Sequence, residues 1–496
     1  MKILKIIKGI LRINEKESKT IESFKEEKDY FKGVQIKDNK IKICLTSDNV
    51  GFLNEILKKV LSIKKINDSN FENFSFLPIK ECSERLKEYL KRINEKYNKK
   101  GIFVEICDGR IINILKKAEH SLNKGITEKE ILRILGFFFE APLIGPRDVV
   151  LSLSNICNLN CIYCEGQTPL LGQNLNKIKR NMLDFESIKQ IISEFYVLGV
   201  ENVLIIGSGE PTMHPNFMEI FSMIQKLGMR INLYSNGLNL NKKLIEEISK
   251  FENWEATFSI SASDYETYEK LHPGIKVEDF KRMKENIKYL CSLNPDKIIY
   301  ILSVVNSLNY DKLEDFVYFA KELSVKKIKL QMVRVDYKIG TDFLKLDEKQ
   351  LKELPEKVKR VRNIAEKNNI EIRGDLFHEL SGLNERGYWS DFSETNPCYA
   401  GWMMSFVTED KKINFCCGRK TVDSIENKSF YKVWNSKTYN DFRIAAKNID
   451  KNFQIPSEPD KKLIDEYCLH CDNLEINEAF KRLLEKSGLK EFLEKQ

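Results

Sequence analysis

The chain has 496 residues, of which 42% are hydrophobic and 31% are charged. That length exceeds what one ordinary hydrophobic core can organise, so two or three globular domains are expected. The net charge of +8 is a mild excess spread along the chain and does not favour nucleic-acid binding. No run of about 18 apolar residues occurs, so no membrane span is predicted. The N-terminus alternates apolar residues and lysine too often for a secretory signal, and most cysteines cluster in short spacings. Both features predict a reducing, cytoplasmic location.

Residues 1–145 are predicted to form an α+β domain of unknown role. A hairpin is expected at 33–44, with Asp38 and Asn39 at its turn. A further strand is expected at 102–106, followed by a helix that ends near residue 139. No motif in this region indicates a specific chemistry, and a peptide-recognition module and a purely structural domain both remain open.

Residues 146–345 alternate strands with helices in a regular way. The strands are apolar and β-branched, which is typical of a parallel sheet that is buried on both faces. Right-handed crossovers close such repeats toward a barrel, and six units are two short of a complete one. We therefore predict a partial (β/α)6 TIM-like barrel. Its strands are expected at 149–153, 202–207, 230–234, 256–260, 298–305 and 327–333.

Three cysteines follow the first of these strands with the spacing C-x3-C-x2-C. They are Cys157, Cys161 and Cys164. A structural zinc site normally has four protein ligands, which three thiolates cannot supply. Three thiolates can hold three irons of a [4Fe–4S] cluster and leave the fourth iron open to an outside ligand. The alternative is that these cysteines are ordinary core residues.

This segment resembles the signature of the radical S-adenosylmethionine (radical SAM) superfamily. The resemblance implies that the open iron binds the amino and carboxylate groups of S-adenosylmethionine (SAM). It also implies that an electron from the cluster cleaves SAM to a 5′-deoxyadenosyl radical. Tyr163 matches the aromatic residue that precedes the third cysteine in the family and lies near the adenine.

Motif-like residues follow the later strands, at the edge where parallel α/β folds bind ligands. Gly207-Ser-Gly-Glu-Pro211 resembles the family's Gly-Gly-Glu-Pro motif, with Ser208 in place of the first glycine. The resemblance assigns Gly209 and Glu210 to the amino group of SAM. Ser235 and Asn236 resemble the family's Thr-Asn-Gly segment, although Asn-Gly is also a common turn. Ser261 lies where the family places ribose contacts, but the acid that often follows is shifted here to Asp264.

Five cysteines mark the end of the chain. A helical linker is expected at 346–395, with a charged helix at 348–367, and a small cysteine-rich iron–sulfur domain at 396–496. This last region resembles the SPASM/twitch extensions of radical SAM enzymes, in the shorter form with one auxiliary [4Fe–4S] cluster. The expected ligands are Cys398, Cys416, Cys468 and Cys471. Cys417 is the alternative to Cys416, and a zinc site fits the spacing equally well.

The sequence as a whole predicts a radical SAM enzyme that abstracts hydrogen from a substrate, with a peptide or protein modification or a small-molecule oxidation as the outcome. Expected partners are SAM, a peptide or small-molecule substrate, and an electron donor such as flavodoxin or ferredoxin. No catalytic acid or base is identified. The alternatives are a non-catalytic iron–sulfur electron carrier or scaffold, which needs no nucleoside-binding residues, and a zinc-stabilised nucleic-acid-binding protein, which requires a basic patch with interleaved aromatic residues.

Overall fold

The computed structural model describes residues 34–37, 40–45, 102–106, 117, 121, 125–138, 140–172, 178–335, 339–373, 397–416, 420–449, 454–455, 458–462 and 474–492. The chain divides into two compact units, one formed by Met1–Gly145 with Glu475–Gln496 and the other by Pro146–Leu474. No helix in these described ranges is long and apolar enough to cross a membrane.

The first unit contains a small sheet and a pair of helices. Strands β1 (Val34–Lys37) and β2 (Lys40–Leu45) pair antiparallel, as the predicted hairpin requires, and β3 (Ile102–Ile106) runs parallel to β2. Helix α6 (Glu128–Phe138) packs against α19 (Leu474–Ser487) through Phe137 and Phe480, whose ring centroids are 5.7 Å apart. The C-terminal helix therefore belongs to the N-terminal unit.

The second unit is built on one ten-stranded sheet with the order β10-β9-β8-β7-β6-β5-β4-β11-β12-β13. Strands β4 to β9 are parallel in sequence order and occupy the six predicted positions. The partial TIM-like barrel predicted from the sequence is confirmed. These strands are β4 (Asp148–Leu151), β5 (Asn202–Ile205), β6 (Arg230–Ser235), β7 (Trp254–Ser259), β8 (Ile299–Val305) and β9 (Lys327–Met332).

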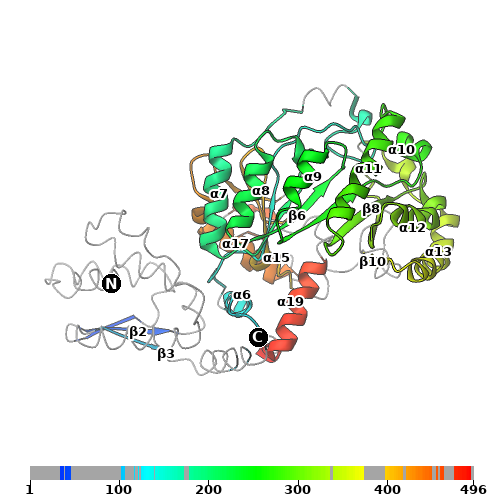
Figure 1. Cartoon of the computed structure of the whole chain (residues 1–496). Coiled ribbons are helices and arrows are strands. Elements are labelled where there is room, and N and C mark those ends of the chain that lie inside the picture. The colour runs from blue at the N-terminus through cyan, green and yellow to red at the C-terminus, as the bar shows by residue number, and fades with distance from the viewer. Residues whose placement is uncertain are drawn as a thin grey trace. The chain divides into compact units, whose positions relative to one another are not determined.

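Helices cover the outer face of this curved sheet (Figure 1). Helix α7 shows why the sequence forms them: Asp184 caps its first turn through the Ser187 amide, and Gly199 ends it at φ 77°. Its apolar stripe, which includes Ile188 and Phe195, is fully buried. The helices in chain order are α7 (Phe185–Leu198), α8 (Phe217–Lys226), α9 (Lys242–Ile248), α10 (Tyr265–Leu271), α11 (Val277–Leu293), α12 (Leu313–Glu322) and α13 (Glu348–Lys367). Short 3₁₀ turns lie at Pro211–Met213, Tyr310–Lys312 and Asp342–Leu344.

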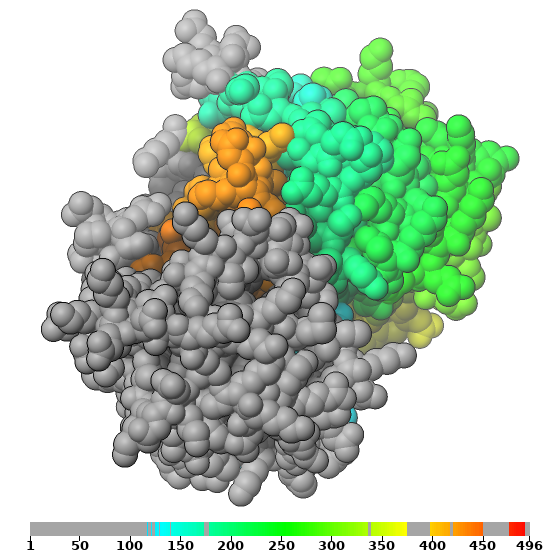
Figure 2. All heavy atoms as spheres, turned by 90° about the vertical axis from the view of Figure 1, so that its left-hand side faces the viewer, coloured from blue at the N-terminus to red at the C-terminus, as the bar shows by residue number. Residues whose placement is uncertain are grey.

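The sheet extends beyond the six predicted strands at both edges. Strand β10 (Glu371–Arg373) adds parallel to β9, and β11 (Met404–Val407) adds parallel to β4. Strands β12 (Lys412–Asn414) and β13 (Thr421–Ser424) continue antiparallel from β11. The C-terminal part also holds α15 (Ala400–Met403), α16 (Phe430–Trp434), α17 (Lys437–Lys447) and the pair β14 (Gln454–Ile455) and β15 (Glu458–Lys462). Figure 2 shows residues from this part, in orange, against the first strand–helix unit of the barrel, in teal.

Candidate functional site

The loop that carries the three cysteines leaves the carboxyl end of β4 and is held by hydrogen bonds along its length. The Ile156 carbonyl accepts the Glu210 amide at 2.9 Å, and the Ile162 amide donates to the Leu271 carbonyl at 3.0 Å. The Gln167 side chain donates to the Asn155 carbonyl at 2.6 Å and accepts from Arg180 at 2.9 Å. The loop is therefore fixed by contacts with β5, α10 and its own flanks before any ligand binds.

The three thiols lie in this loop and are each partly exposed. Burial raises the pKa of Cys157 to about 11 and raises the pKa of Cys161 and Cys164, and the Cys164 thiolate further raises the pKa of Cys157 and Cys161. Arg180 acts in the opposite direction on Cys164. In the described part of the chain no three His, Cys, Asp or Glu side chains converge as a closed metal site. Metal binding would have to release the thiol protons, which is the normal linkage for thiolate ligands.

Gly209 lies where two backbones meet. A Cβ atom at this position would be 2.6 Å from the Ile156 nitrogen and 2.7 Å from the Asn155 carbonyl carbon. Only glycine allows the strand end of β5 to approach the cysteine loop this closely. The glycine of the predicted SAM-binding motif therefore sets the position of the cysteine loop itself.

Glu210, the next residue of that motif, is 2% exposed and its carboxylate is fully engaged within the protein. One oxygen accepts from Thr212 Oγ1 at 2.5 Å and from Ser235 Oγ at 2.8 Å, and the other accepts from the Asn236 amide at 2.8 Å. Burial raises the pKa of Glu210, and the hydrogen bonds from Asn236, Thr212 and Ser235 oppose that rise. Glu210 thus ties the carboxyl ends of β5 and β6 together, and its backbone amide bonds to the cysteine loop at Ile156.

Asn236 extends this cluster to the first cysteine. Its side-chain nitrogen donates to Asn158 Oδ1 at 2.7 Å and lies 3.8 Å from Cys157 Sγ. Its side-chain oxygen accepts the Leu238 amide at 3.0 Å. Three of the predicted SAM-contacting residues, Glu210, Ser235 and Asn236, are therefore one hydrogen-bonded group beside Cys157.

Tyr163 and Ser261 meet on the other side of the loop. Tyr163 OH is 3.1 Å from Ser261 Oγ and 3.2 Å from His272 Nε2. His272 Nδ1 lies 2.8 Å from the Tyr268 carbonyl, so Nδ1 carries the proton and Nε2 accepts from Tyr163. Ser261 Oγ accepts the Val304 amide at 3.0 Å, which leaves its hydroxyl to donate to Tyr163.

Ser261 also adopts a left-handed backbone, with φ 60°, and its side chain is fully buried. A non-glycine residue pays a conformational cost in that region, and here the Asn309 side chain holds its carbonyl at 2.8 Å. The hydroxyl that the sequence assigned to a ribose contact is thus oriented toward Tyr163 of the cysteine loop.

The comparisons with known proteins agree with this arrangement. Residues 151–320 match the family model described as the radical SAM superfamily. These residues form a radical SAM domain. The match begins with the last residue of β4 and includes the cysteine loop and the ends of β5 to β8.

Individual relatives of the chain are distant in sequence. It is 26% identical to GTP 3′,8-cyclase of Synechococcus elongatus over 184 residues, which cover 36% of this chain and 54% of that one. It is 24% identical to the AdoMet-dependent heme synthase of Methanosarcina barkeri over 315 residues, or 59% of this chain and 83% of that one. The chain thus spans about half the length of the cyclase and most of the heme synthase.

Among solved structures, Streptococcus suis SuiB bound to S-adenosylmethionine is similar in fold, with a TM-score of 0.50 and 18% identity. The similarity covers 79% of this chain and 83% of SuiB, well beyond the barrel. A radical SAM domain implies a [4Fe–4S] cluster and SAM, and three thiols with Arg180 beside Cys164 fit that pair.

The predicted auxiliary ligands are described only in part. Cys398 and Cys416 are half-buried, and the Cys398 amide donates to the Ala446 carbonyl at 3.0 Å. Cys417, Cys468 and Cys471 lie outside the described residues. The turn that precedes Cys416 places Lys411 at φ 63°. An ion pair at 2.9 Å joins Lys411 to Asp184, the cap of α7, and lowers the pKa of that carboxyl.

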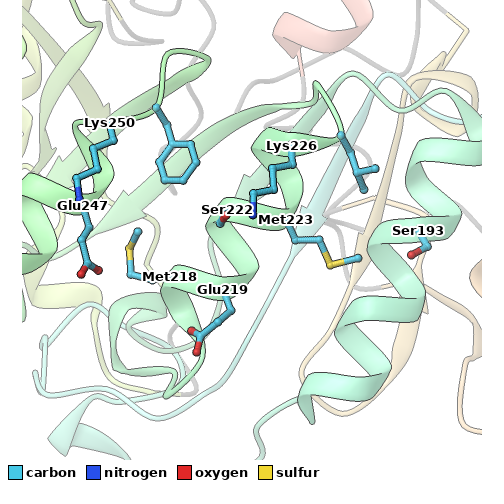
Figure 3. A pocket seen from close by; sticks show the side chains of 10 residues that line it. Ser193, Met218, Glu219, Ser222, Met223, Lys226, Glu247 and Lys250 are labelled. Atoms are coloured by element: carbon cyan, nitrogen blue, oxygen red, sulfur yellow. The ribbon is translucent and has the colours of Figure 1, made fainter.

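A hollow of about 670 Å³ lies elsewhere, on the outer helices of the radical SAM barrel (Figure 3). It is open and lies between α7, α8 and α9, with Ser193 on one side and Glu247 and Lys250 on the other. Chemistry in a parallel barrel takes place at the carboxyl ends of the strands. This hollow is therefore a feature of the outer surface and is not part of the site.

Sequence reasoning missed several residues of the site, among them Arg180, Gln167 and His272. His272 is the C-cap of α10, in a segment for which the sequence analysis predicted no element. Arg180 and Gln167 carry no motif spacing. The only signal in the sequence was that both residues are close to the cysteines along the chain. That indicates that they lie near the site, but not which atoms they contact.

Proposed function

We propose that this radical SAM enzyme uses SAM at Cys157, Cys161 and Cys164 to abstract hydrogen from a peptide or small-molecule substrate, with an auxiliary metal–thiolate cluster in the C-terminal region. When bound, the first cluster supplies the electron that cleaves SAM to a 5′-deoxyadenosyl radical. The protein's task is to position both groups and exclude water. Gly209 and the Glu210 cluster hold the cysteine loop, and we expect the amino group of SAM to lie beside them at the ends of β5 and β6.

The observation that supports the auxiliary cluster is a buried positive charge. Arg443 of α17 is 0% exposed and lies between the rings of Trp434 and Tyr439, 4.1 and 4.3 Å from their centroids. Its Nε and Nη2 atoms donate to the carbonyls of Gly401 and Trp434 at 2.9 and 3.0 Å. Its Nη1 atom has no hydrogen-bond partner in the structure as described.

Within the described residues Arg443 forms no ion pair, and a buried charge without a partner is costly. Burial lowers the pKa of Arg443 to about 9. The two described candidate ligands flank the helix that carries it. Cys398 is bonded to Ala446, three residues further along α17, and the Cys416 thiolate acts on the neighbouring Tyr439. Four thiolates around a metal cluster carry net negative charge, which would compensate Arg443. Cys398, Cys416, Cys468 and Cys471 are the proposed ligands.

The test is anaerobic reconstitution of the wild-type protein and of a variant with Cys157, Cys161 and Cys164 replaced by alanine. We expect about eight irons in the wild type and about four in the variant. With dithionite and SAM, the wild type should form 5′-deoxyadenosine and the variant should not. If the variant held no iron, or held zinc instead, the auxiliary iron–sulfur cluster would be excluded. The proposal for the first cluster would be unaffected.

The electron donor and the location follow from the same chemistry. Reduction of the first cluster in the cell needs a low-potential one-electron donor, which we propose to be a flavodoxin or ferredoxin in a reducing cytoplasm. Replacing dithionite by a reduced flavodoxin, and in a separate assay by a reduced ferredoxin, tests the donor. Nucleoside formation with dithionite but not with either carrier would contradict this part of the proposal.

A further inference from the structure

The inner face of the barrel holds Lys329 of β9, which forms no ion pair with any residue that the structure describes. Strand β9 alternates, with Ile328 and Leu330 fully buried under the outer helices and Lys329 between them pointing to the other face. Lys329 Nζ donates to Tyr234 OH of β6 at 3.1 Å and to Thr257 Oγ1 of β7 at 3.2 Å. It also lies 4.4 Å from the centroid of the Tyr300 ring of β8. Four strands thus contribute to one small polar cluster.

Lys329, Tyr234 and Thr257 each carry hydrogen-bond donors. An ammonium has three N–H bonds, and two of them go to the hydroxyls of Tyr234 and Thr257. Because those hydroxyl oxygens accept from Lys329, their own hydrogens must point elsewhere. Within the described chain neither hydroxyl hydrogen has an acceptor, and neither does the third N–H of Lys329. Three donors therefore converge without an acceptor.

The nearby carboxylates do not neutralise Lys329. Glu255, two residues before Thr257, pairs with Arg230 at 3.8 Å. Glu371 of β10 is engaged by both Lys327 and Arg373. In the ranges that the structure describes, Lys329 forms no ion pair. A single unpaired positive charge surrounded by neutral donors matches a monoanion rather than a dianionic phosphate ester.

The register of the sheet places this cluster near the chemistry. Lys329 is paired with Leu302 of β8, and Leu302 with Ser259, the last residue of β7. Two residues beyond Ser259 is Ser261, which contacts Tyr163 of the cysteine loop. The next inward-facing residue on β9, Gln331, is exposed, so the cluster lies just below the open carboxyl end of the barrel.

We propose that Lys329, Tyr234 and Thr257 form the binding site for a carboxylate group of the substrate. The proposal rests on the function proposed above and narrows its substrate class to molecules with a carboxylate. The ammonium supplies the charge, the two hydroxyls supply oriented donors, and the Tyr300 ring holds the lysine side chain in place. The carboxylate would anchor the substrate below SAM, with the rest of the molecule extending toward the strand ends.

The test uses fluorine NMR of trifluoroacetate, a small carboxylate probe, with oxidised holoenzyme saturated with SAM. Trifluoroacetamide, which has the same shape without the charge, is the matched probe. We expect trifluoroacetate to bind and the amide not to bind. In Lys329→Met the affinity for trifluoroacetate should be roughly tenfold or more weaker, as loss of one charge-assisted hydrogen bond predicts. Lys329→Arg should retain much of it, and Lys327→Met, which alters an ion-paired lysine on the same strand, should bind as the wild type does.

Displacement by two competitors distinguishes whether the carboxylate belongs to a peptide or to a small acid. Displacement by N-acetyl-glycyl-aspartyl-glycinamide assigns it to an acidic residue of a peptide, and displacement by glutarate assigns it to a small acid. Equal probe binding in wild type and Lys329→Met, equal binding of the amide, or displacement by neither competitor would overturn the site. Probe binding does not require SAM cleavage, so a failed nucleoside assay and a failed carboxylate site are separate results.

Discussion

At the scale of single residues, the side chains that the family resemblance assigns to SAM are occupied with the protein itself. Glu210, Ser235 and Asn236 bond to one another, and Tyr163 bonds to Ser261 and His272. Their common effect is to fix the cysteine loop from two sides. Preorganisation of this kind lets a cluster bind without ordering the loop that holds it.

Asn236 gives the first prediction, because its N–H group points at the sulfur of a cluster ligand. Hydrogen bonds to cluster sulfurs favour the more negative, reduced state. Replacement by alanine should lower the reduction potential of the first cluster. If a hydrogen bond of about 1 kcal/mol were lost from the reduced state alone, the shift would be about 40 mV for a one-electron couple. A redox titration followed by electron paramagnetic resonance measures it.

The matched control for that titration is Asn239→Ala. Asn239 is close in sequence but donates to the Thr212 carbonyl rather than to the cysteine loop. An unchanged potential in Asn236→Ala with full iron content, or an equal shift in both variants, would show that the N–H···S contact has no electronic effect.

His272 gives a prediction about pH. Burial lowers its pKa to about 4, from an ordinary value of 6.5. Between these values the unfolded chain binds the proton and the folded chain does not, so stability falls as pH decreases from about 6.5 to 4. The full loss corresponds to about 3 kcal/mol. His272→Gln should remove this part of the pH dependence, which denaturant titrations at pH 7, 5.5 and 4.5 would show as a smaller change in the unfolding midpoint. Parallel pH profiles in the two proteins would contradict the assignment.

At the scale of elements, the sequence predicted what local patterns determine. The alternation of apolar strand segments with helices predicted all six barrel strands. The capping residue Asp184 marks the start of α7. The cysteine spacing located the cluster loop. Strand β11 has four residues, and its pairing with β4, about 250 positions earlier, depends on long-range register that no local pattern encodes. Lys329 was not predicted as a site residue for the same reason, because its proposed role depends on Tyr234 and Thr257, which lie on two other strands.

The contact between β5 and the cysteine loop can be tested with two glycines. Gly209→Ala places a Cβ atom 2.6 Å from the Ile156 nitrogen, so one backbone must move. Such overpacking typically costs about 1–3 kcal/mol, and here the strain falls on the loop that holds the cluster. We expect Gly209→Ala to fold with a normal circular dichroism spectrum but to retain much less iron after reconstitution.

Gly166→Ala is the control, because it is also a glycine beside the cysteine loop. Its added Cβ atom would meet nothing closer than the Ser208 carbonyl at 3.8 Å, an ordinary contact. Iron content should therefore match the wild type. If both variants bound iron equally well, the close approach at Gly209 would not be what positions the loop.

At the scale of the whole molecule, the C-terminal region is part of the barrel sheet. Strand β11 pairs with β4 along its full length, and the Ser152 amide, just after β4, donates to the Val407 carbonyl at 2.9 Å. Ser152 Oγ also donates to Glu409 at 2.7 Å. The strand that leads into the cysteine loop is therefore hydrogen-bonded to the strand that leads toward Cys416. A substrate radical formed near SAM and a cluster in this region would share one rigid support.

Arg443 gives the last prediction, in which the sign of a stability effect depends on the metal. Without a cluster, its uncompensated charge is a cost, and replacing a buried charge by an apolar residue is often neutral or stabilising by about 1–4 kcal/mol. In the variant lacking Cys157, Cys161 and Cys164, Arg443→Met should therefore leave the metal-free protein as stable or more stable. In the reconstituted protein the same change removes the positive charge beside an anionic cluster, so iron retention and the reduction potential should both fall. Arg443→Lys, which keeps the charge, should lose less of either. A destabilised metal-free protein together with an unchanged potential would show that Arg443 only packs against Trp434 and Tyr439.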